Sequence, residues 1–415
     1  MQSKELYASI ELAEDELRLI VGELFMSRLN VLKYERVKMS GITNGIITDA
    51  DSVSASIVKA MYDAEKTLGY KIKSVILCIP SNHVKCIKRR VSVPIGEGSK
   101  RIRVYHAKQG LAKVIDDIKM NDNNMSFVNV GSIKYINGGI TSRSIPVDEQ
   151  ADVLKMDIDL LLVDRNIVYS YVNAVELSGL KVLDVCLDSY AIAEESAILE
   201  NSVDQYIILN TFEKNETTLT LFYKGRLVGS EGMGYGYNRF IQSIKRKYHL
   251  SYKECLRLLK ECSIYNENEI NGSIVYLYLE HNERKQITRQ DIYECVRADF
   301  EKWCQDLNEL NAPIIESGKT KMIISGSGAD IIGLDILIKE GLFECESEIY
   351  VPETIGVRRG CYSAALGAIY AHNKWAELLG NTSSEIEITR EEIRKMKNDE
   401  ENAFTSKLKS FLLNK

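Results

Sequence analysis

Alternating apolar and polar residues divide the start of the chain into strands, and a helical pattern follows them. Apolar residues alternate through residues 7–12 and 17–24, around the polar turn Ala-Glu-Asp-Glu at 13–16, and strand character continues through 28–36. From 51 to 68 apolar residues recur at helical spacing, with Asp49 or Asp51 as the predicted N-cap and Gly69 as the predicted C-cap. A buried strand follows at 73–80.

The pattern of apolar and polar residues then changes. Residues 84–164 carry alternating strands around one predicted helix at 104–120, which indicates an inserted α+β module. After it the pattern predicts a helix at 166–178, a strand at 181–189 and a short helix at 191–200.

The second half repeats the order of the first. The pattern predicts a strand at 202–211, a hairpin at 217–231 that turns at Lys224–Gly225, and strands within 270–284. The pattern also predicts a strand, a glycine turn and a helix within 321–342, and a strand at 348–353. The predicted helices of this half are 236–248, 251–263, 287–310 and 358–379. Two halves that each begin with a β-hairpin predict a duplicated α/β fold with a cleft between the halves.

Composition excludes several classes of protein. A chain of 415 residues is too long for one core and predicts two to four domains. The net charge of -6 argues against a general nucleic-acid binder. Nine cysteines occur singly, without a CxxC pair, which supports neither a disulfide framework nor a zinc site. No apolar run is long enough for a membrane span, and acids interrupt the N-terminal apolar stretch, so we expect a protein of the reducing cytoplasm.

The end of the chain has a different pattern. Residues 381–403 are polar and charged and predict a linker, whereas the last twelve residues alternate lysines with large apolar residues. On a helix, Phe404, Leu408, Phe411 and Leu412 share one face, and Lys407 and Lys409 flank it. This pattern predicts a helix that lies in the membrane interface, and several such tails on one polymer would bind firmly. The alternative is a helix that docks on its own core or on a partner.

Four runs of residues, at 10–23, 40–86, 324–334 and 362–367, resemble in this order the bacterial cell-division protein FtsA. The resemblance implies an actin-like (ribonuclease H-like) duplicated α/β fold with an inserted α+β subdomain, called 1C, and a C-terminal amphipathic helix. It divides the chain into subdomain 1A at 1–83 and 165–203, subdomain 1C at 84–164, subdomain 2A at 204–248 and 312–380, subdomain 2B at 249–311, a linker at 381–403 and a membrane helix at 404–415.

The resemblance also implies a function. FtsA-like proteins polymerise on the inner face of the cytoplasmic membrane, at the division site, and tether the ring of the tubulin-like protein FtsZ to it. The expected partners are the C-terminal peptide of FtsZ, further copies of this chain and the membrane surface, and not nucleic acid. By position, Arg297, Phe300 and Lys302 are candidates for the peptide contact, although a charged helix face is often only solvated. The alternatives are an active ATPase of the actin superfamily and an adaptor of pilus assembly similar to PilM.

The same resemblance implies an ATP site, whose motifs survive unevenly in this sequence. The glycine turn Ser325, Gly326, Ser327 and Gly328 is intact and could lie against a purine and ribose, or be a simple tight turn. Gly232 and Gly234 stand where a weak anion site would lie.

The two phosphate turns depart from the family pattern. Asn210 replaces an acid, Thr217 keeps its place, and Lys214 is expected to be a solvated turn lysine. The first turn, 13–16, is predicted to be exposed and acidic, and its carboxylates would repel phosphates. We therefore expect ATP binding to be weak or lost, magnesium to bind only with ATP, and hydrolysis to be slight. The sequence offers no other catalytic or metal-binding arrangement.

Overall fold

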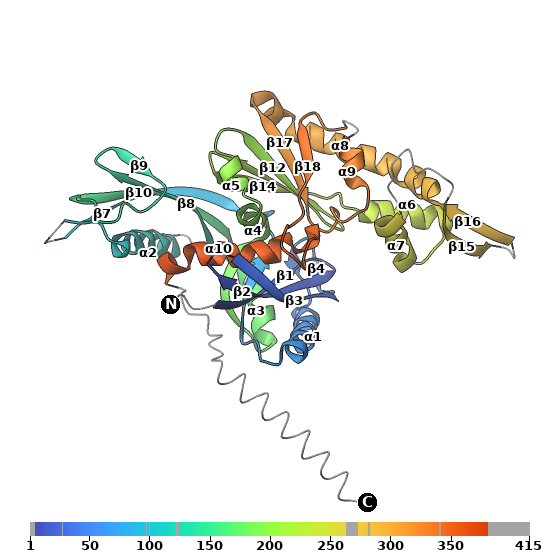
Figure 1. Ribbon diagram of the computed structural model, residues 1–415, viewed down its shortest axis with the longest axis horizontal. Helices are drawn as coiled ribbons and strands as arrows, with labels where there is room; N and C mark the ends of the chain where they lie inside the picture. Colours follow the sequence, from blue (N-terminus) through green and yellow to red (C-terminus); the bar gives the residue numbers. More distant parts are fainter. Residues whose placement is uncertain are drawn as a thin grey trace, which may run out of the picture.

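The computed structural model describes residues 5–26, 28–96, 98, 100–121, 124–262, 273–280, 283–339 and 342–380. In it, two halves that each contain a mixed sheet pack against each other, and further elements extend from both ends (Figure 1). The fold class is actin-like α/β, as the sequence predicts.

The sheet of the first half has the strand order β11-β6-β1-β2-β3. β1 pairs antiparallel with β2 and parallel with β6, so a hairpin is extended by strands that return through helices. The strands are β1 (Glu5–Leu12), β2 (Glu16–Phe25), β3 (Arg28–Lys38), β6 (Ser74–Ile79) and β11 (Lys181–Leu187). A small hairpin, β4 (Ile42–Thr43) with β5 (Ile46–Ile47), lies between β3 and the first helix.

Helices cover this sheet. α1 and α3 pack against each other, and α10 contacts β1, β6 and α4 (Figure 1). The helices are α1 (Ala50–Leu68), α3 (Arg165–Leu177), α4 (Asp188–Glu195), α5 (Ile198–Asn201) and α10 (Ser363–Leu379). Asp49 caps α1 and accepts a hydrogen bond from the Ser52 amide, and Gly69 ends it at φ 77°. The single helix predicted at 191–200 is instead α4 and α5, which are separated at Ala197, where φ is 55°.

The second sheet repeats the logic of the first, with the order β14-β13-β12-β17-β18. Its hairpin strands pair antiparallel, and β17 joins β12 in parallel. The strands are β12 (Tyr206–Phe212), β13 (Thr217–Tyr223), β14 (Arg226–Met233), β17 (Thr320–Ser325) and β18 (Glu346–Ile349). The hairpin turns at Lys224 and Gly225, both with positive φ, as predicted. β18 begins and ends earlier than the strand predicted at 348–353.

Helices α6, α7 and α8 share a second core with this sheet, and this core includes Trp303 and Phe300. The elements are α6 (Asn238–Tyr248), α7 (Tyr252–Cys262), β15 (Ile274–Glu280), β16 (Glu283–Thr288), α8 (Arg289–Ser317) and α9 (Leu334–Lys339). α8 opens on a capping box between Thr288 and Asp291 and runs past its predicted end, through Pro313. A short 3-10 helix, η2 (Gly360–Tyr362), leads into α10.

Between β6 and α3 the chain builds a third sheet with the order β7-β10-β8-β9. Helix α2 packs on it over a core of its own, at the end of the molecule opposite β15 and β16 (Figure 1). The elements are β7 (Lys85–Pro94), α2 (Val104–Asn121), β8 (Met125–Asn137), β9 (Ile140–Ser142) and β10 (Val153–Asp164).

The predicted tail lies outside the described residues. This applies to the linker at 381–403 and to the membrane candidates Phe404, Lys407, Leu408, Lys409, Phe411 and Leu412. Among the helices that the structure does describe, none combines the length and the apolar character that a membrane crossing requires.

Candidate functional site

The turns of the first hairpins of the two halves contact each other. Asp15, in the turn between β1 and β2, forms an ion pair with Lys214, and their Oδ2 and Nζ atoms lie 3.1 Å apart. Asn215 donates a hydrogen bond from Nδ2 to Glu14 Oε2 at 2.7 Å. The sequence expectations of an exposed acidic turn and of a solvated Lys214 are therefore wrong, because each turn supplies the partner of the other.

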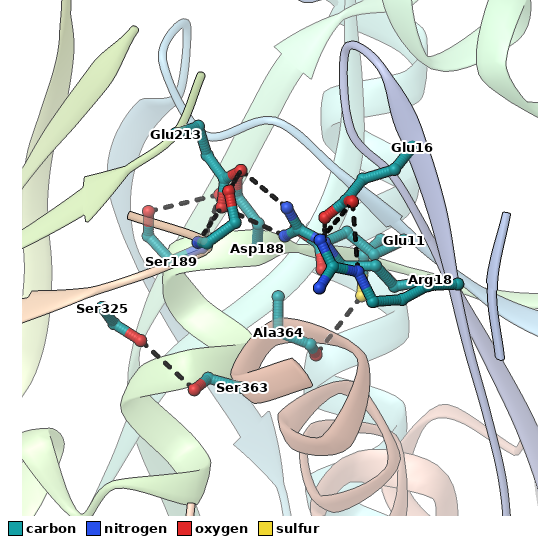
Figure 2. A network of polar contacts seen from close by, with 12 residues as sticks. Glu11, Glu16, Arg18, Asp188, Ser189, Glu213, Ser325, Ser363 and Ala364 are labelled. Carbon is teal, nitrogen blue, oxygen red and sulfur yellow. Dashed lines mark hydrogen bonds and ion pairs between the residues drawn. The ribbon is translucent and has the colours of Figure 1, made fainter. Parts of the chain in front are cut away.

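Beneath these turns Arg18 joins the two halves. Its side chain is 1% exposed and points from β2 toward the second turn (Figure 2). Nη2 and Nη1 lie 2.6 and 3.0 Å from the two carboxylate oxygens of Glu213. Arg18 also donates to Glu11 at 2.9 Å and to Glu16 at 2.8 Å. A buried guanidinium is stable only when it is paired in this way, so the three carboxylates hold Arg18 in place.

A second arginine completes this group. Arg36 of β3 also binds Glu16, so that carboxylate lies between two guanidinium groups. We call Glu11, Glu16, Arg18, Arg36 and Glu213 the Arg18 cluster. Burial by itself would raise the pKa of Glu16, but the charges of Arg18 and Arg36 outweigh it and lower this pKa to about 2.

The environment acts in the opposite direction on two neighbouring acids. Burial raises the pKa of Glu11 despite the charge of Arg18. Burial also raises the pKa of Asp188 to about 6, although Ser81 and Ser189 donate hydrogen bonds to its carboxylate. Burial thus makes both of these carboxyl groups resist ionisation.

The glycine turn from Ser325 to Gly328 is packed against the second hairpin. The amide of Ser327 donates to Glu213 Oε1 at 2.8 Å, and its hydroxyl donates to Oε2 at 2.7 Å. Gly326 has φ 88°, and a Cβ there would lie 2.7 Å from Glu213 Oε1. A Cβ on Gly328 would lie 2.2 Å from the ring of Phe212. These glycines allow the turn to approach protein atoms, and Glu213 occupies the backbone edge that the sequence assigned to a purine and ribose.

Thr217 and Asn210, which the sequence placed at the second phosphate turn, are both buried. Thr217 is fully buried, and its hydroxyl donates to the carbonyl of Tyr235 at 2.6 Å and accepts from Trp303 Nε1 at 3.0 Å. Asn210 is also fully buried, and neither amide atom has a hydrogen-bond partner among the described residues. Thr217 therefore belongs to the core and does not face the cleft.

Gly232 and Gly234 differ in their surroundings. A Cβ on Gly232 would lie 1.8 Å from Glu216 Oε1, and Asn82 donates to that same carboxylate at 3.2 Å. A Cβ on Gly234 would meet nothing within 4 Å. A carboxylate thus lies where an anion was expected beside Gly232.

Two cavities flank the Arg18 cluster. The inner one, of about 70 Å³, lies between the hairpin turns and is lined by five carboxylates, those of Glu11, Glu14, Asp188, Glu213 and Glu216. No set of His, Cys, Asp and Glu residues in the described ranges has an arrangement that could hold a metal ion. The outer cavity, of about 1200 Å³, is lined by β3, α7 and the segment before η2.

The sequence reasoning did not select the Arg18 cluster as a site, although one signal was available. Glu16 and Arg18 are two residues apart on one strand, so their side chains share a face. Acidic residues also occur in both hairpin turns, a pattern that favours a buried basic partner between them.

The candidates for peptide binding separate into two groups. Arg297 and Lys302 are exposed on α8, where they pair with Glu301 and Asp306 one turn later. Phe300 is 1% exposed and packs against Phe240 and Trp303. The assignment of Phe300 to a partner surface is therefore corrected, because its ring belongs to the second core.

No protein-family model matches the chain. Among curated proteins, the chain is 22% identical over 372 residues to the cell division protein FtsA of Bacillus subtilis, and the aligned region covers 89% of this chain and 84% of that protein. The chain is also 22% identical over 386 residues to FtsA of Staphylococcus epidermidis RP62A, and this alignment covers 90% of the chain and 80% of that protein. The resemblance to FtsA is thereby confirmed.

Solved structures share the fold. A PilM-PilN complex of type IV pilus biogenesis aligns with TM-score 0.56 and 13% identity, over 88% of this chain and 98% of the other. MreB5 of Spiroplasma citri bound to ADP aligns with TM-score 0.51 and 12% identity, over 91% and 99%. These likenesses confirm the actin-like fold.

Proposed function

We propose that this chain is a cell-division scaffold that assembles on the inner face of the membrane and tethers FtsZ there, without using ATP. The curated relatives named FtsA and the actin-like fold support the division role. The observation that carries the absence of ATP use is the bidentate bond between Arg18 and Glu213, which links the two halves.

A magnesium triphosphate does not fit these residues. Phosphates need free backbone amides and cationic side chains between the turns. Here the Ser327 amide donates to Glu213, Lys214 pairs with Asp15, and Arg18 is shared by three carboxylates. The inner cavity of about 70 Å³ is also too small for a triphosphate. We infer that the Arg18 cluster replaces the nucleotide as the link between the halves.

The proposed anchor is the amphipathic segment from Phe404 to Lys415. A single tail gives a small net binding energy, since burial of its apolar side chains is largely offset by the ordering of twelve residues. A polymer that carries many tails binds firmly because each further contact is intramolecular. In this proposal the actin-like core supplies the polymer, and the exposed face of α8 near Arg297 and Lys302 is the candidate surface for the acidic FtsZ peptide.

The test is co-sedimentation of the full chain with anionic vesicles and FtsZ, in the absence of nucleotide. We expect removal of 404–415 to lower the bound fraction at least tenfold, and Leu408→Asp to have nearly the same effect. The matched control is Ser410→Asp, which adds the same charge away from the apolar face and should retain most binding. If the truncated chain pellets like the full chain, the anchor is wrongly assigned.

The fold similarity to the PilM-PilN complex favours one second candidate, an adaptor of pilus assembly. A pull-down with the C-terminal peptide of FtsZ separates the two. Capture of the chain by that peptide, weakened by Arg297→Glu, supports the division role. No capture at any salt concentration supports the adaptor.

A further inference from the structure

One edge of the second sheet is open. β14 is the last strand on its side of that sheet, and among the described residues it pairs with β13 alone. Arg226, at the start of β14, binds Asp159 of the third sheet. An edge strand presents a row of backbone N–H and C=O groups with which a further strand can pair. The outer side of β14 beyond Arg226 is therefore available for strand addition.

A groove follows this open edge. It has a volume of about 550 Å³ and is lined by six consecutive residues of β14, Val228 to Met233. Since consecutive residues point to opposite faces of a sheet, a groove lined by six in a row follows the edge of the strand. Its other wall is α8, at Leu310 and Ile314. Apolar side chains make up most of the lining, namely those of Ile208, Leu219, Leu221, Val228, Met233, Leu310 and Ile314. A groove between an edge strand and apolar side chains is typical of domains that bind an extended peptide as an added strand.

Gly229 gives a second reason to expect another backbone at this edge. A Cβ on Gly229 would meet no atom within 4 Å, and this glycine does not adopt a positive φ. Neither the packing of the described residues nor the backbone conformation therefore requires glycine here. Glycine inside a strand often marks a place where another backbone approaches closely.

The predicted linker contains a segment with the pattern of a strand. Residues 385–390, which lie outside the described residues, read Glu-Ile-Glu-Ile-Thr-Arg. In an extended conformation this segment carries Ile386, Ile388 and Arg390 on one face and polar residues on the other. The two isoleucines match the apolar wall of the groove. Arg390 matches Glu231, which lines the groove, is exposed and forms no ion pair with another described residue.

A neighbouring copy is the better source of this segment than the same chain. α10 ends at Gly380, and its last turn packs through Leu378 and Leu379 on the core of the third sheet. The groove lies in the second half, between β14 and α8. The five residues that follow Gly380 reach only to the start of the segment and span at most about 17 Å. A segment from another copy has no such limit on its path.

We propose that residues 385–390 of one copy add as a strand to β14 of a second copy, with the two isoleucines against the apolar wall and Arg390 beside Glu231. The contact is heterologous, because the strand and the groove are different surfaces, so each copy can donate one strand and accept another. Such contacts continue from copy to copy and add to a polymer. This contact goes beyond the proposed function, because binding to the membrane and to FtsZ requires no strand from another copy.

The test is sedimentation velocity of the full chain over a range of concentrations, without nucleotide, vesicles or FtsZ. Ile388→Asp places a charge on the apolar face of the donated segment, and Leu310→Asp places one in the groove. We expect each variant to lower the association constant at least tenfold. The matched controls are Ile393→Asp, beyond the alternating segment, and Leu177→Asp on α3, whose exposed fraction of 53% equals that of Leu310. Both controls should leave the association constant unchanged.

Two combinations of variants identify the contact. An equal mixture of the Ile388→Asp and Leu310→Asp chains should form dimers, because the first keeps an intact groove and the second keeps an intact segment. Glu231→Arg should weaken association, and Arg390→Glu in the same chain should restore it, since the two charges are then exchanged.

Hydrogen exchange tests the same contact without any variant. The backbone amides of residues 228–233 should exchange more slowly as the concentration of the full chain rises, because an added strand protects them. Three results would overturn the proposal. They are equal association of the Ile388→Asp and Ile393→Asp chains, a mixture of Ile388→Asp and Leu310→Asp that stays monomeric, and exchange at 228–233 that does not depend on concentration. None of these results bears on vesicle or FtsZ binding, so failure here is distinct from failure of the scaffold role.

Discussion

The inner and outer parts of the cleft lie between the same two halves and are both rich in charge, yet they differ in how that charge is satisfied. In the inner part, Arg18 is bonded to three carboxylates, and the turns supply each other's partners. In the outer part, Lys260 donates to the Ser327 carbonyl and lies over the Tyr237 ring, and no direct ion pair holds it among the described residues. The number of charges alone is therefore a poor guide to how firmly a region is held, because direct pairing differs between the two parts.

The inner and outer parts of the cleft also differ in what they contribute to the molecule. The inner part holds the halves together through buried ion pairs, in which removal of one partner leaves the other charge desolvated. The outer part has open space and fewer direct ion pairs across it. Substitutions in the inner part should therefore change stability more than substitutions in the outer part.

The largest effect is expected from Arg18→Gln. This change removes the shared partner of Glu11, Glu16 and Glu213, which leaves the buried Glu11 without a cation and Glu16 with Arg36 alone. We expect the free energy of unfolding to fall by about 3–5 kcal/mol, measured by urea unfolding at pH 7.

Arg90→Gln is the matched control for Arg18→Gln. Arg90 also binds a carboxylate through two nitrogens, in Asp157, but its side chain is 66% exposed. Its loss should cost much less stability than the loss of Arg18, because solvent screens an exposed ion pair. Equal costs for the two variants would show that the Arg18 cluster is no more important than a surface ion pair.

A smaller effect of opposite sign is expected from Asp188→Asn. Because the pKa of Asp188 is raised from 3.8 to about 6, its contribution to stability is full below pH 3.8 and is lost as the pH rises through 6. At pH 7 the folded protein holds an unfavourable buried charge, which asparagine removes while it keeps an oxygen for the hydrogen bonds from Ser81 and Ser189. We expect a gain of about 1–2 kcal/mol at pH 7 that vanishes near pH 4, measured by urea unfolding at both values.

Asp157→Asn serves as the control for this pH dependence. Its hydrogen bond from Arg90 lowers the pKa of Asp157, so the sign is reversed and the substitution should destabilise the protein at pH 7. If the gain in the free energy of unfolding of Asp188→Asn does not change with pH, the assignment of a buried acid with a raised pKa at that position is contradicted.

The fold was largely predictable because its signals are local and repeated. Asp49 and Gly69 mark the ends of α1, Thr288 and Asp291 form the capping box of α8, and Lys224–Gly225 makes the hairpin turn. Each of these residues acts within its own element. The break at Ala197 was missed because alanine gives no sign that it will adopt a positive φ.

The site was less predictable because its bonds join residues far apart in the sequence. The partner of Arg18 is Glu213, on the other half, and that of Lys214 is Asp15. Within one turn no residue indicates a partner, so the acids of the first turn were predicted to be exposed. Phe300 was predicted to contact a peptide because only the fold places its ring in the second core. Family likeness located the cleft, but the physical role of each residue followed from the pairing.

The central claim is that the Arg18 cluster takes the place of a nucleotide, and calorimetric titration of the full chain with ATP and magnesium tests it most directly. We expect no binding at micromolar concentrations, because the Glu213 carboxylate already accepts from the Ser327 amide and from Arg18. Micromolar affinity that requires magnesium would show instead that phosphates displace these bonds and that the Arg18 cluster does not replace a nucleotide.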